Sequence, residues 1–311
     1  MAARYKQTLL LFVLMGSLLF LVSQLHDLYS NRAAIYGYTQ EDTYQEVEEA
    51  EPRVLILGNS LTFSHDLPGM TEAIVRELHP QWREARIFAI APPGHQLAGH
   101  LDDLSRWSPY PRAIEHALGT QEPHLTWHTV LLQDASWIMA SPNEADRLAS
   151  HASIQALSQV VFEHDAKLML FSSWGYSPAH TTSFTPSQST QMARDIERGY
   201  REAGAQIDAT QAGTREATRH LLAGRAFDVL LQEDSALHAK LFIDDRHPSA
   251  AGTYLTALVL AHMLTERSVS EVTWRPSSIS EQGATRLRQI ADAIATEELR
   301  REATAQARIQ E

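Results

Sequence analysis

The sequence predicts an α/β protein of three layers, in which helices cover both faces of a mostly parallel sheet. Two observations lead to this prediction. Short apolar runs with strand character alternate with longer segments of helical periodicity, as in successive β-α-β units. Most runs are apolar at consecutive positions, which is typical of strands buried on both faces. The chain has 311 residues, 44% of them hydrophobic, which suffices for one large domain with an ample core.

The individual elements follow from these patterns. The segments predicted as strands are 54–57, 86–91, 129–133, 168–173 and 205–209. The segments predicted as helices are 67–78, the stretch after 145, 190–203, 250–264 and the stretch from about 281. The segment 177–189 is rich in Ser, Thr and Pro, so we expect a long loop there that could lie over a site.

The N-terminus has the pattern of an export signal or membrane anchor. Basic Arg4 and Lys6 precede an apolar run over 9–22 that can be extended to Leu25. We find no A-x-A-like pair after it, which favours an uncleaved anchor at 1–25 over a cleaved signal peptide, a buried core helix being the other alternative. The acidic stretch 26–52 is predicted to be a tether, and 53–311 the domain. This order places the domain outside the cytoplasm, periplasmic or extracellular, or secreted if the segment is cleaved.

Composition excludes several classes of function. The formal net charge is -12, which argues against a nucleic-acid partner, because such binding needs basic surfaces that displace counterions. The chain has no Cys, so disulfides, Cys-ligated zinc and a Cys nucleophile are all excluded.

A candidate nucleophile follows the first predicted strand. The run Val54–Leu57 leads directly into Gly58, Asn59 and Ser60, and a helical pattern follows. A Ser at such a strand-to-helix turn has backbone N–H groups nearby that can stabilise an oxyanion. Taken alone, the residue could equally be a helix cap.

A candidate base lies near the C-terminus. Asp244 and His247 are three positions apart, and Pro248 disfavours helix at His247, so both lie in a loop before the helix that Ser249 can cap. Such spacing can bring the carboxylate to imidazole Nδ1 and leave Nε2 free as a base. A solvated charged turn is the alternative.

Two further residues follow predicted strands. Gly94 follows the second strand and allows a backbone N–H to approach a substrate closely, although a plain turn would also use Gly. Gln133 ends the third strand, at the edge of the sheet where ligands bind in open α/β folds.

The four elements occur in an order that resembles the SGNH (GDSL-type) hydrolase superfamily. The strings LILGNSLT, VLLQDAS and DDRHPSAAGTYLTALV are most similar to its uncharacterised bacterial SGNH-like members with G-N-S and D-x-x-H-P motifs, and the match covers about 53–266. The resemblance implies a flavodoxin-like three-layer fold and no metal or organic cofactor.

The resemblance also implies a role for each matching residue. Ser60 would be the nucleophile, His247 the base and Asp244 its orienter, with an oxyanion hole from the N–H groups of Ser60 and Gly94 and the side chain of Gln133. Two positions depart from the family pattern: Asn59 replaces an Asp, and Gln133 replaces the usual Asn. A similar string contains Gln232, but it lies only twelve residues before Asp244, so we assign the site to Gln133 and expect Gln232 in an edge strand or loop.

The function expected from this resemblance is carboxylic ester hydrolysis through a Ser60 acyl-enzyme. The expected substrate is a small-molecule or polysaccharide ester, such as an O-acetylated carbohydrate of the cell envelope. The alternatives are an acyltransferase with the same triad, a lipid esterase, and a catalytically inactive envelope binding protein.

Other polar and aromatic residues have plainer structural roles as alternatives. His124 and His128 have the spacing of a metal pair but lack the Glu of H-E-x-x-H, so no metal site is predicted. His95 and His100 are predicted to lie at the surface or rim. Asp66 is expected to cap the helix 67–78, and Trp174 either lines a pocket or packs in the core.

Overall fold

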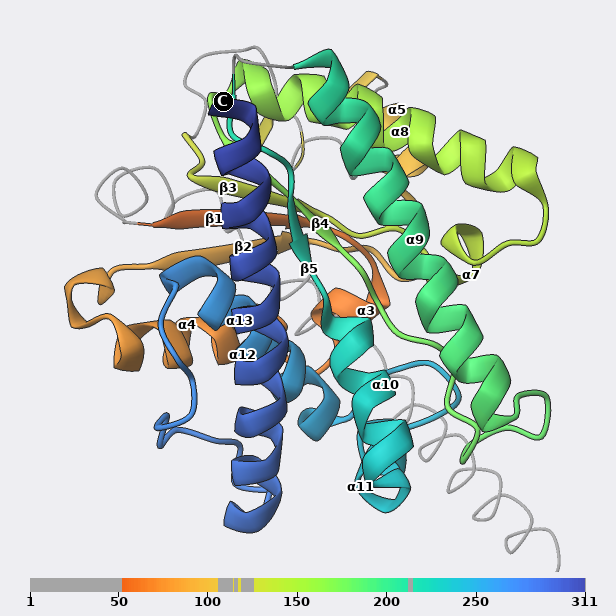
Figure 1. Ribbon diagram of the computed structural model, residues 1–311, viewed down its shortest axis with the longest axis vertical. Helices are drawn as coiled ribbons and strands as arrows, with labels where there is room; N and C mark the ends of the chain where they lie inside the picture. The colour runs from red at the N-terminus through yellow and green to blue at the C-terminus, as the bar shows by residue number, and fades with distance from the viewer. Residues whose placement is uncertain (1–51, 106–113, 115–116, 119–125, 212–214, 311) are drawn as a thin grey trace, which may run out of the picture.

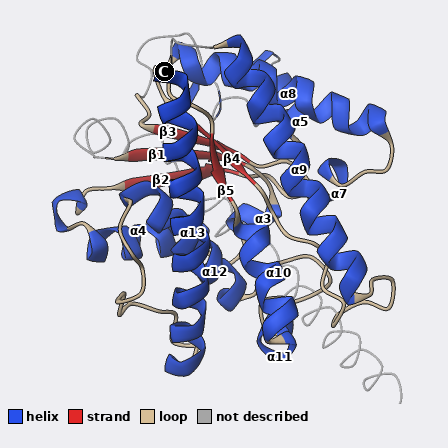
Figure 2. Ribbon diagram, viewed as in Figure 1, coloured by secondary structure: helices blue, strands red, loops and turns tan. Residues whose placement is uncertain are grey.

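The central element of the fold is a five-stranded parallel sheet in the order β2-β1-β3-β4-β5 (Figures 1 and 2). The computed structural model describes residues 52–105, 114, 117–118, 126–211 and 215–310. The strands are β1 (Arg53–Leu57), β2 (Arg86–Ile90), β3 (Thr129–Leu132), β4 (Lys167–Phe171) and β5 (Arg219–Leu221). Four of the five predicted strands are thereby confirmed to within two residues.

Helices occupy most of the remaining described chain. They are α3 (Ser60–Phe63), α4 (Leu67–Leu78), the 3₁₀ turn η1 (Pro80–Trp82), α5 (Leu97–Ser105), α7 (Ser136–Met139), α8 (Glu144–Glu163), α9 (Pro186–Thr210), α10 (Ala223–Glu233), α11 (Ser235–Ala239), α12 (Ala250–Thr265) and α13 (Glu281–Gln310). The predicted helix 67–78 is confirmed. Helix α9 begins at Pro186, before the predicted start at 190, because Thr185 and Gln188 form a capping box there.

The sheet is covered on both faces, which confirms the predicted layers. Helices α5, α8 and α9 pack on one face, and α4, α12 and α13 on the other (Figure 1). Strand β1 shows why: Leu55 and Leu57 belong to the core on the first of these faces, whereas Val54 and Ile56 belong to the core on the second. Successive strand side chains point to opposite faces, so a strand that is apolar at every position needs a helical layer on each side.

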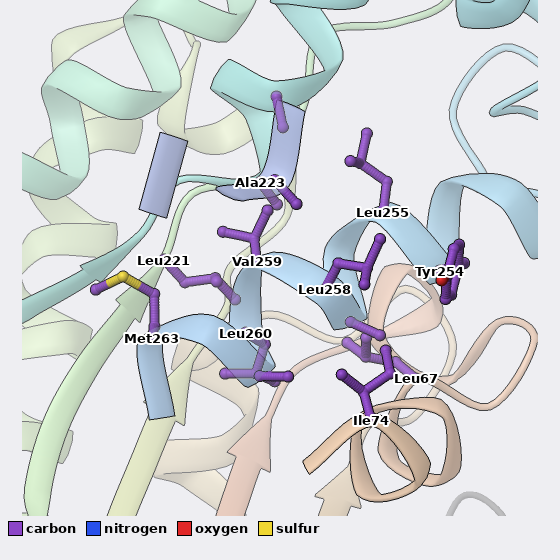
Figure 3. Close-up of a cluster of buried hydrophobic side chains, with 14 of the residues drawn as sticks. Leu67, Ile74, Leu221, Ala223, Tyr254, Leu255, Leu258, Val259, Leu260 and Met263 are labelled. Carbon is purple, nitrogen blue, oxygen red and sulfur yellow. The ribbon is translucent and has the colours of Figure 1, made fainter. Parts of the chain in front are cut away.

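Among the residues that the structure describes, the longest run of buried residues is in α12. Figure 3 shows its Leu255, Leu258 and Val259 packed against α4 and the end of β5. Tyr254, Leu255, Leu258 and His262 are all buried. Each large apolar side chain buried in this way contributes about 1.5–3 kcal/mol to folding, so α12 is a rigid support for the loop that precedes it.

The strand predicted at 205–209 is wrong, because these residues belong to α9. Ile196, Tyr200, Ala203 and Ile207 are buried at helical spacing, so the apolar periodicity of α9 continues through the segment. The fifth strand is instead Arg219–Leu221, a three-residue edge strand with little apolar content.

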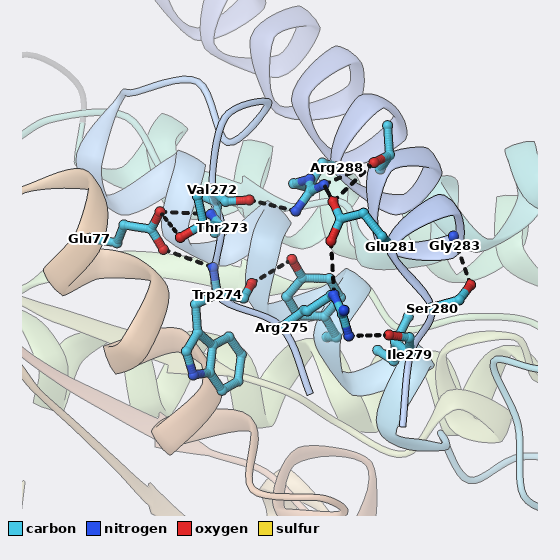
Figure 4. A network of polar contacts seen from close by, with 12 residues as sticks. Glu77, Val272, Thr273, Trp274, Arg275, Ile279, Ser280, Glu281, Gly283 and Arg288 are labelled. Atoms are coloured by element: carbon cyan, nitrogen blue, oxygen red, sulfur yellow. Dashed lines mark hydrogen bonds and ion pairs between the residues drawn. The ribbon is translucent and has the colours of Figure 1, made fainter. Parts of the chain in front are cut away.

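A polar network fixes the chain between α12 and α13 (Figure 4). The carboxylate of Glu77 in α4 accepts hydrogen bonds from the N–H groups of Thr273 and Trp274 at 2.7 and 3.0 Å. Arg288 of α13 donates to the carbonyl oxygen of Val272. These contacts tie α4 and α13 together on the face of the sheet that supports the site.

The predicted N-terminal segment 1–25 and the tether up to residue 51 lie outside the described residues. Within the part of the chain that the structure describes, no helix is both long and apolar enough to cross a membrane.

Candidate active site

Ser60 lies at the carboxyl edge of the sheet, as the first residue of the short helix α3. The turn before it is tight: a Cβ on Gly58 would lie 2.4 Å from Thr62 Oγ1 and 2.8 Å from Gln133 Oε1, so only Gly fits there. Asn59 caps α3 by accepting a hydrogen bond from the N–H of Leu61. The turn thus presents Ser60 at the N-terminus of a helix.

The loop that contains Asp244 and His247 is closed by pairing between its two ends. Phe242 and Pro248 form an isolated β-bridge, and the N–H of Ile243 donates to the carbonyl oxygen of His247 at 3.0 Å. The N-cap of α12, Ser249, follows directly. The loop is therefore short and anchored to the buried helix α12.

The chain after β4 holds this loop from a second side. The indole N–H of Trp174 donates to the carbonyl oxygen of Arg246 at 2.8 Å, and the N–H of Ser177 donates to that of Asp245 at 2.7 Å. Trp174 is buried and stacks on Phe227 with ring centroids 4.3 Å apart. Of the two roles considered for Trp174, core packing is the one observed. Its hydrogen bond to the loop has no local sequence signal.

The structure brings Ser60, His247 and Asp244 together in one chain of hydrogen bonds. His247 Nε2 lies 3.0 Å from Ser60 Oγ, and His247 Nδ1 lies 2.7 Å from Asp244 Oδ2. Because the carboxylate only accepts, Nδ1 carries the proton and Nε2 has a free lone pair toward the hydroxyl. This is the arrangement of a nucleophile, a base and an orienting group.

Asp244 is held in its ionised form. Partial burial acts to raise the pKa of its carboxyl group, but hydrogen bonds outweigh that effect and lower the pKa to about 2. Asp244 Oδ1 accepts from the N–H groups of His247 at 2.7 Å and Arg246 at 2.9 Å. The other oxygen, Oδ2, faces the imidazole, so the negative charge of Asp244 lies next to the ring that would become an imidazolium.

Gly94 lies in the loop after β2, with a φ of +68° that favours Gly. A Cβ at Gly94 would meet nothing within 4 Å. The loop is joined to the nucleophile turn, because Asn59 Nδ2 donates to the carbonyl oxygen of His95 at 3.0 Å. Among the described residues, neither the N–H of Gly94 nor that of Ser60 donates to another protein group. Both remain available for a substrate oxygen.

Gln133 lies fully buried beneath the nucleophile turn. Its Oε1 accepts hydrogen bonds from the N–H of Asn59 at 3.1 Å and from Thr62 Oγ1 at 3.0 Å. Its Nε2 donates to the carbonyl oxygen of Asp134. Oε1 thus accepts two hydrogen bonds from the turn and Nε2 donates one of its two hydrogens to the backbone, so in this arrangement Gln133 supports the nucleophile turn.

The structure also places the residues that were considered as alternatives. Gln232 lies in α10, not in a strand or loop, and its Nε2 donates to Thr190 Oγ1. Asp66 caps α4 as predicted. His124 lies outside the described residues, while His128 Nδ1 accepts from the N–H of Arg53. His100 is buried, which corrects the predicted surface position.

Asp134 is a supporting residue that the sequence reasoning missed. It is buried, and its carboxylate accepts hydrogen bonds from the N–H groups of Leu97 and Ala135 and from Ser150 Oγ. Burial raises the pKa of Asp134, although these hydrogen bonds act to lower it. Asp134 thereby joins β3, α5 and α8 behind the site. Its position directly after Gln133, at a strand end, was the available signal.

Comparison with known proteins was informative only at the level of structure. No family profile and no curated protein matches the chain. A protein described as a candidate SGNH hydrolase from Slackia heliotrinireducens is 27% identical, with a TM-score of 0.47 over 68% of this chain and 97% of that one. A DUF4886 family protein from Bacteroides uniformis is 17% identical, with a TM-score of 0.54 over 79% of this chain and 95% of that one.

An acetyl-xylooligosaccharide esterase from Geobacillus is 13% identical, with a TM-score of 0.47 over 69% of this chain and 94% of that one. The structures similar to this chain thus include SGNH-type hydrolases, esterases and a DUF4886 protein. Of these three structures, the Bacteroides uniformis protein has the highest TM-score, at 0.54. The chain has the α/β fold of that DUF4886 family member.

Proposed function

We propose that the protein is a serine ester hydrolase that acts through a Ser60 acyl-enzyme. The observation that carries this proposal is the chain of hydrogen bonds from Ser60 Oγ through His247 to Asp244, with distances of 3.0 and 2.7 Å. A surface Ser, His and Asp in unrelated roles have no reason to align donor to acceptor in this way. The same alignment is what activation of a hydroxyl requires.

In the proposed mechanism, Ser60 Oγ attacks the ester carbonyl carbon while His247 Nε2 takes the hydroxyl proton. The carbonyl oxygen becomes an oxyanion that the N–H groups of Ser60 and Gly94 stabilise. His247 then gives its proton to the departing alkoxide, and an acyl-enzyme remains. Water, deprotonated by His247, attacks that ester, and the proton returns to Ser60 as the acid leaves. Asp244 stays ionised throughout.

In this proposal Gln133 is a positioning residue rather than an oxyanion donor. It fixes the N–H of Asn59 and the hydroxyl of Thr62, which lie on either side of Ser60 in the chain. Removing one oxyanion donor in related chemistry costs about 2.7–4 kcal/mol of barrier. Two donors are therefore enough to supply a large part of the rate enhancement.

The proposed substrate is an O-acyl ester on a carbohydrate. Trp137 in α7, directly after β3, is 51% exposed at the edge of the sheet that carries Ser60. Ile243, next to Asp244, is exposed as well. An exposed aromatic side chain at the same edge of the sheet as the nucleophile suits the apolar face of a sugar ring. A membrane-anchored body outside the cytoplasm, proposed from the N-terminal sequence, would place the enzyme near envelope polysaccharide.

The test uses the full-length chain in detergent, a fluorophosphonate probe and 4-nitrophenyl acetate. Labelling and turnover that are lost in Ser60→Ala and His247→Ala, with circular dichroism unchanged, are the expected results. Absence of labelling in folded wild type would overturn the proposal and favour a binding protein. Adding an oligosaccharide acceptor separates hydrolysis from acyl transfer, since only transfer yields an acylated sugar.

A further inference from the structure

Three side chains with metal-binding atoms meet behind the nucleophile turn. His95, His100 and Asp103 each offer a ring nitrogen or carboxylate oxygen, and these atoms all lie within 4.8 Å of one another. His100 and Asp103 lie three positions apart on α5, so they share one face of that helix. His95 approaches from the loop before the helix, and its Nε2 lies 2.9 Å from Asp103 Oδ2.

His100 has the hydrogen bonding of a metal ligand. Its Nε2 lies 2.8 Å from the carbonyl oxygen of Gly58, which can only accept, so Nε2 carries the ring proton. Nδ1 then has a free lone pair, yet it is buried without any hydrogen-bond partner, in a side chain only 1% exposed. Metal-bound His residues characteristically donate their other N–H to a carbonyl or carboxylate, as His100 does.

The surroundings of His100 Nδ1 also favour a ligand at that atom. A buried acceptor without a partner costs free energy in the folded protein. No described hydrogen-bond donor offsets that cost at Nδ1.

The chain leaves room for the second imidazole. A Cβ on Gly99 would lie 2.7 Å from Cε1 and 2.8 Å from Nε2 of His95, so the ring rests directly on the glycine. The two imidazoles pack edge to face, with centroids 4.5 Å apart. His95 and Asp103 remain 24% and 15% exposed, which gives an ion a path of entry.

We propose that His95, His100 and Asp103 form a binding site for a divalent transition-metal ion, with Zn²⁺ as the best match. Two imidazole nitrogens and one carboxylate suit Zn²⁺ and its neighbours, whereas Mg²⁺ and Ca²⁺ prefer all-oxygen sites. Ligand atoms at about 2.0–2.2 Å from Zn²⁺ lie within about 4 Å of one another. The three groups therefore need to shift by about 1 Å or less to reach these separations, and water can complete four-coordination.

The ion would have a structural role. It would replace the proton between His95 Nε2 and Asp103, and His95 would then hold its proton on Nδ1. It would join α5 to the loop of Gly94 and, through His100, to the carbonyl of Gly58. No reacting group of the proposed esterase is needed for this binding, so the site stands or fails independently of that activity.

The experiment titrates Zn²⁺ into the full-length, chelator-treated protein, purified without a histidine tag. We expect binding of one Zn²⁺ per chain by calorimetry, and at 100 times the dissociation constant a rise in melting temperature of about 5 °C. Co²⁺ at the same site should give the intense visible bands of a four-coordinate complex. His95→Gln and Asp103→Asn should each weaken binding by about 100-fold or more, since even second-shell partners account for 10–100-fold.

The matched control is His262→Gln. His262 also faces a carboxylate, with Nδ1 3.2 Å from Asp292 Oδ1, but among the described residues this pair belongs to no cluster of three metal-binding groups. Its substitution should leave Zn²⁺ affinity unchanged. Unaltered Zn²⁺ affinity in folded His95→Gln and Asp103→Asn would overturn the proposal, as would failure of the wild-type protein to bind Zn²⁺ or Co²⁺.

Discussion

Asn59 joins the nucleophile turn to the loop after β2: its Nδ2 donates to the carbonyl oxygen of His95 at 3.0 Å, while its Oδ1 accepts from the N–H of Leu61 at 3.2 Å. One side chain thus fixes both the start of α3, where Ser60 lies, and the loop that contains Gly94. Asn can do this because its amide has a donor and an acceptor.

This dual role leads to a prediction for Asn59→Asp. The carboxylate keeps the cap on α3 but replaces the donor to His95 with an acceptor, so two oxygens face each other. We expect turnover of 4-nitrophenyl acetate to slow about 10-fold or more, because an unpaired acceptor of this kind costs about 1–3 kcal/mol. Helix content by circular dichroism should be retained. An unchanged turnover rate would show that the link to His95 is unimportant for the loop.

Substitution of Gln133 distinguishes a supporting role from an oxyanion role. Gln133→Met leaves the N–H of Asn59 and the hydroxyl of Thr62 unpaired in a buried position, so we expect a loss of stability of about 2–4 kcal/mol together with slower turnover. Urea unfolding and steady-state kinetics provide the two readouts. Turnover slowed by about 10²–10³-fold in a fully stable variant would instead assign Gln133 to the oxyanion hole.

Asp244→Asn tests whether the charge of the Asp244 carboxylate is needed, because Asn has nearly the same shape. The amide oxygen can still accept the N–H bonds from Arg246 and His247, but it no longer provides a carboxylate toward Nδ1. The imidazole then loses its preferred tautomer, and we expect turnover to slow by about 10⁴-fold, as for the corresponding change in a Ser-His-Asp protease. The measurement is the hydrolysis rate at pH 7–8. A loss below about tenfold would contradict an orienting role for the carboxylate.

Trp137→Ala tests the proposed carbohydrate substrate. Loss of a stacking face should raise KM for an acetylated oligosaccharide by about 2–10-fold, corresponding to about 0.5–1.5 kcal/mol, without changing the kinetics of 4-nitrophenyl acetate. The control is Leu148→Ala in α8, which removes another exposed apolar side chain. Equal effects of Trp137→Ala on both substrates would argue against sugar stacking.

Buried histidines should make stability fall in acid. Burial, aided by Arg201, lowers the pKa of His220 from 6.5 to about 3 in the folded protein. Between these values the unfolded chain binds a proton that the folded chain excludes, so stability decreases as pH falls from 6.5 toward 3. His220→Gln should reduce that slope by up to about 1.4 kcal/mol per pH unit. The measurement is urea unfolding at pH 7, 6 and 5, and an unchanged slope would contradict the prediction.

The sequence alone was sufficient to predict the three layers of the fold. Runs such as Val54–Leu57 are apolar at every position, and only a sheet covered on both faces buries all of them. The error at 205–209 has the same physical origin, because a short apolar segment fits a helix as well as a strand. The true edge strand Arg219–Leu221 has too few apolar residues to reveal itself.

At the site, the sequence determined which residue types were available, and local rules placed them at strand ends and in loops. Ser60 and His247 are 187 positions apart, so only packing of α12 against the sheet brings their side chains to 3.0 Å. The direction of the Gln133 amide and the burial of His100 also depend on contacts distant in the chain. Such contacts leave no periodicity in the sequence, which is why tertiary structure alone decided them.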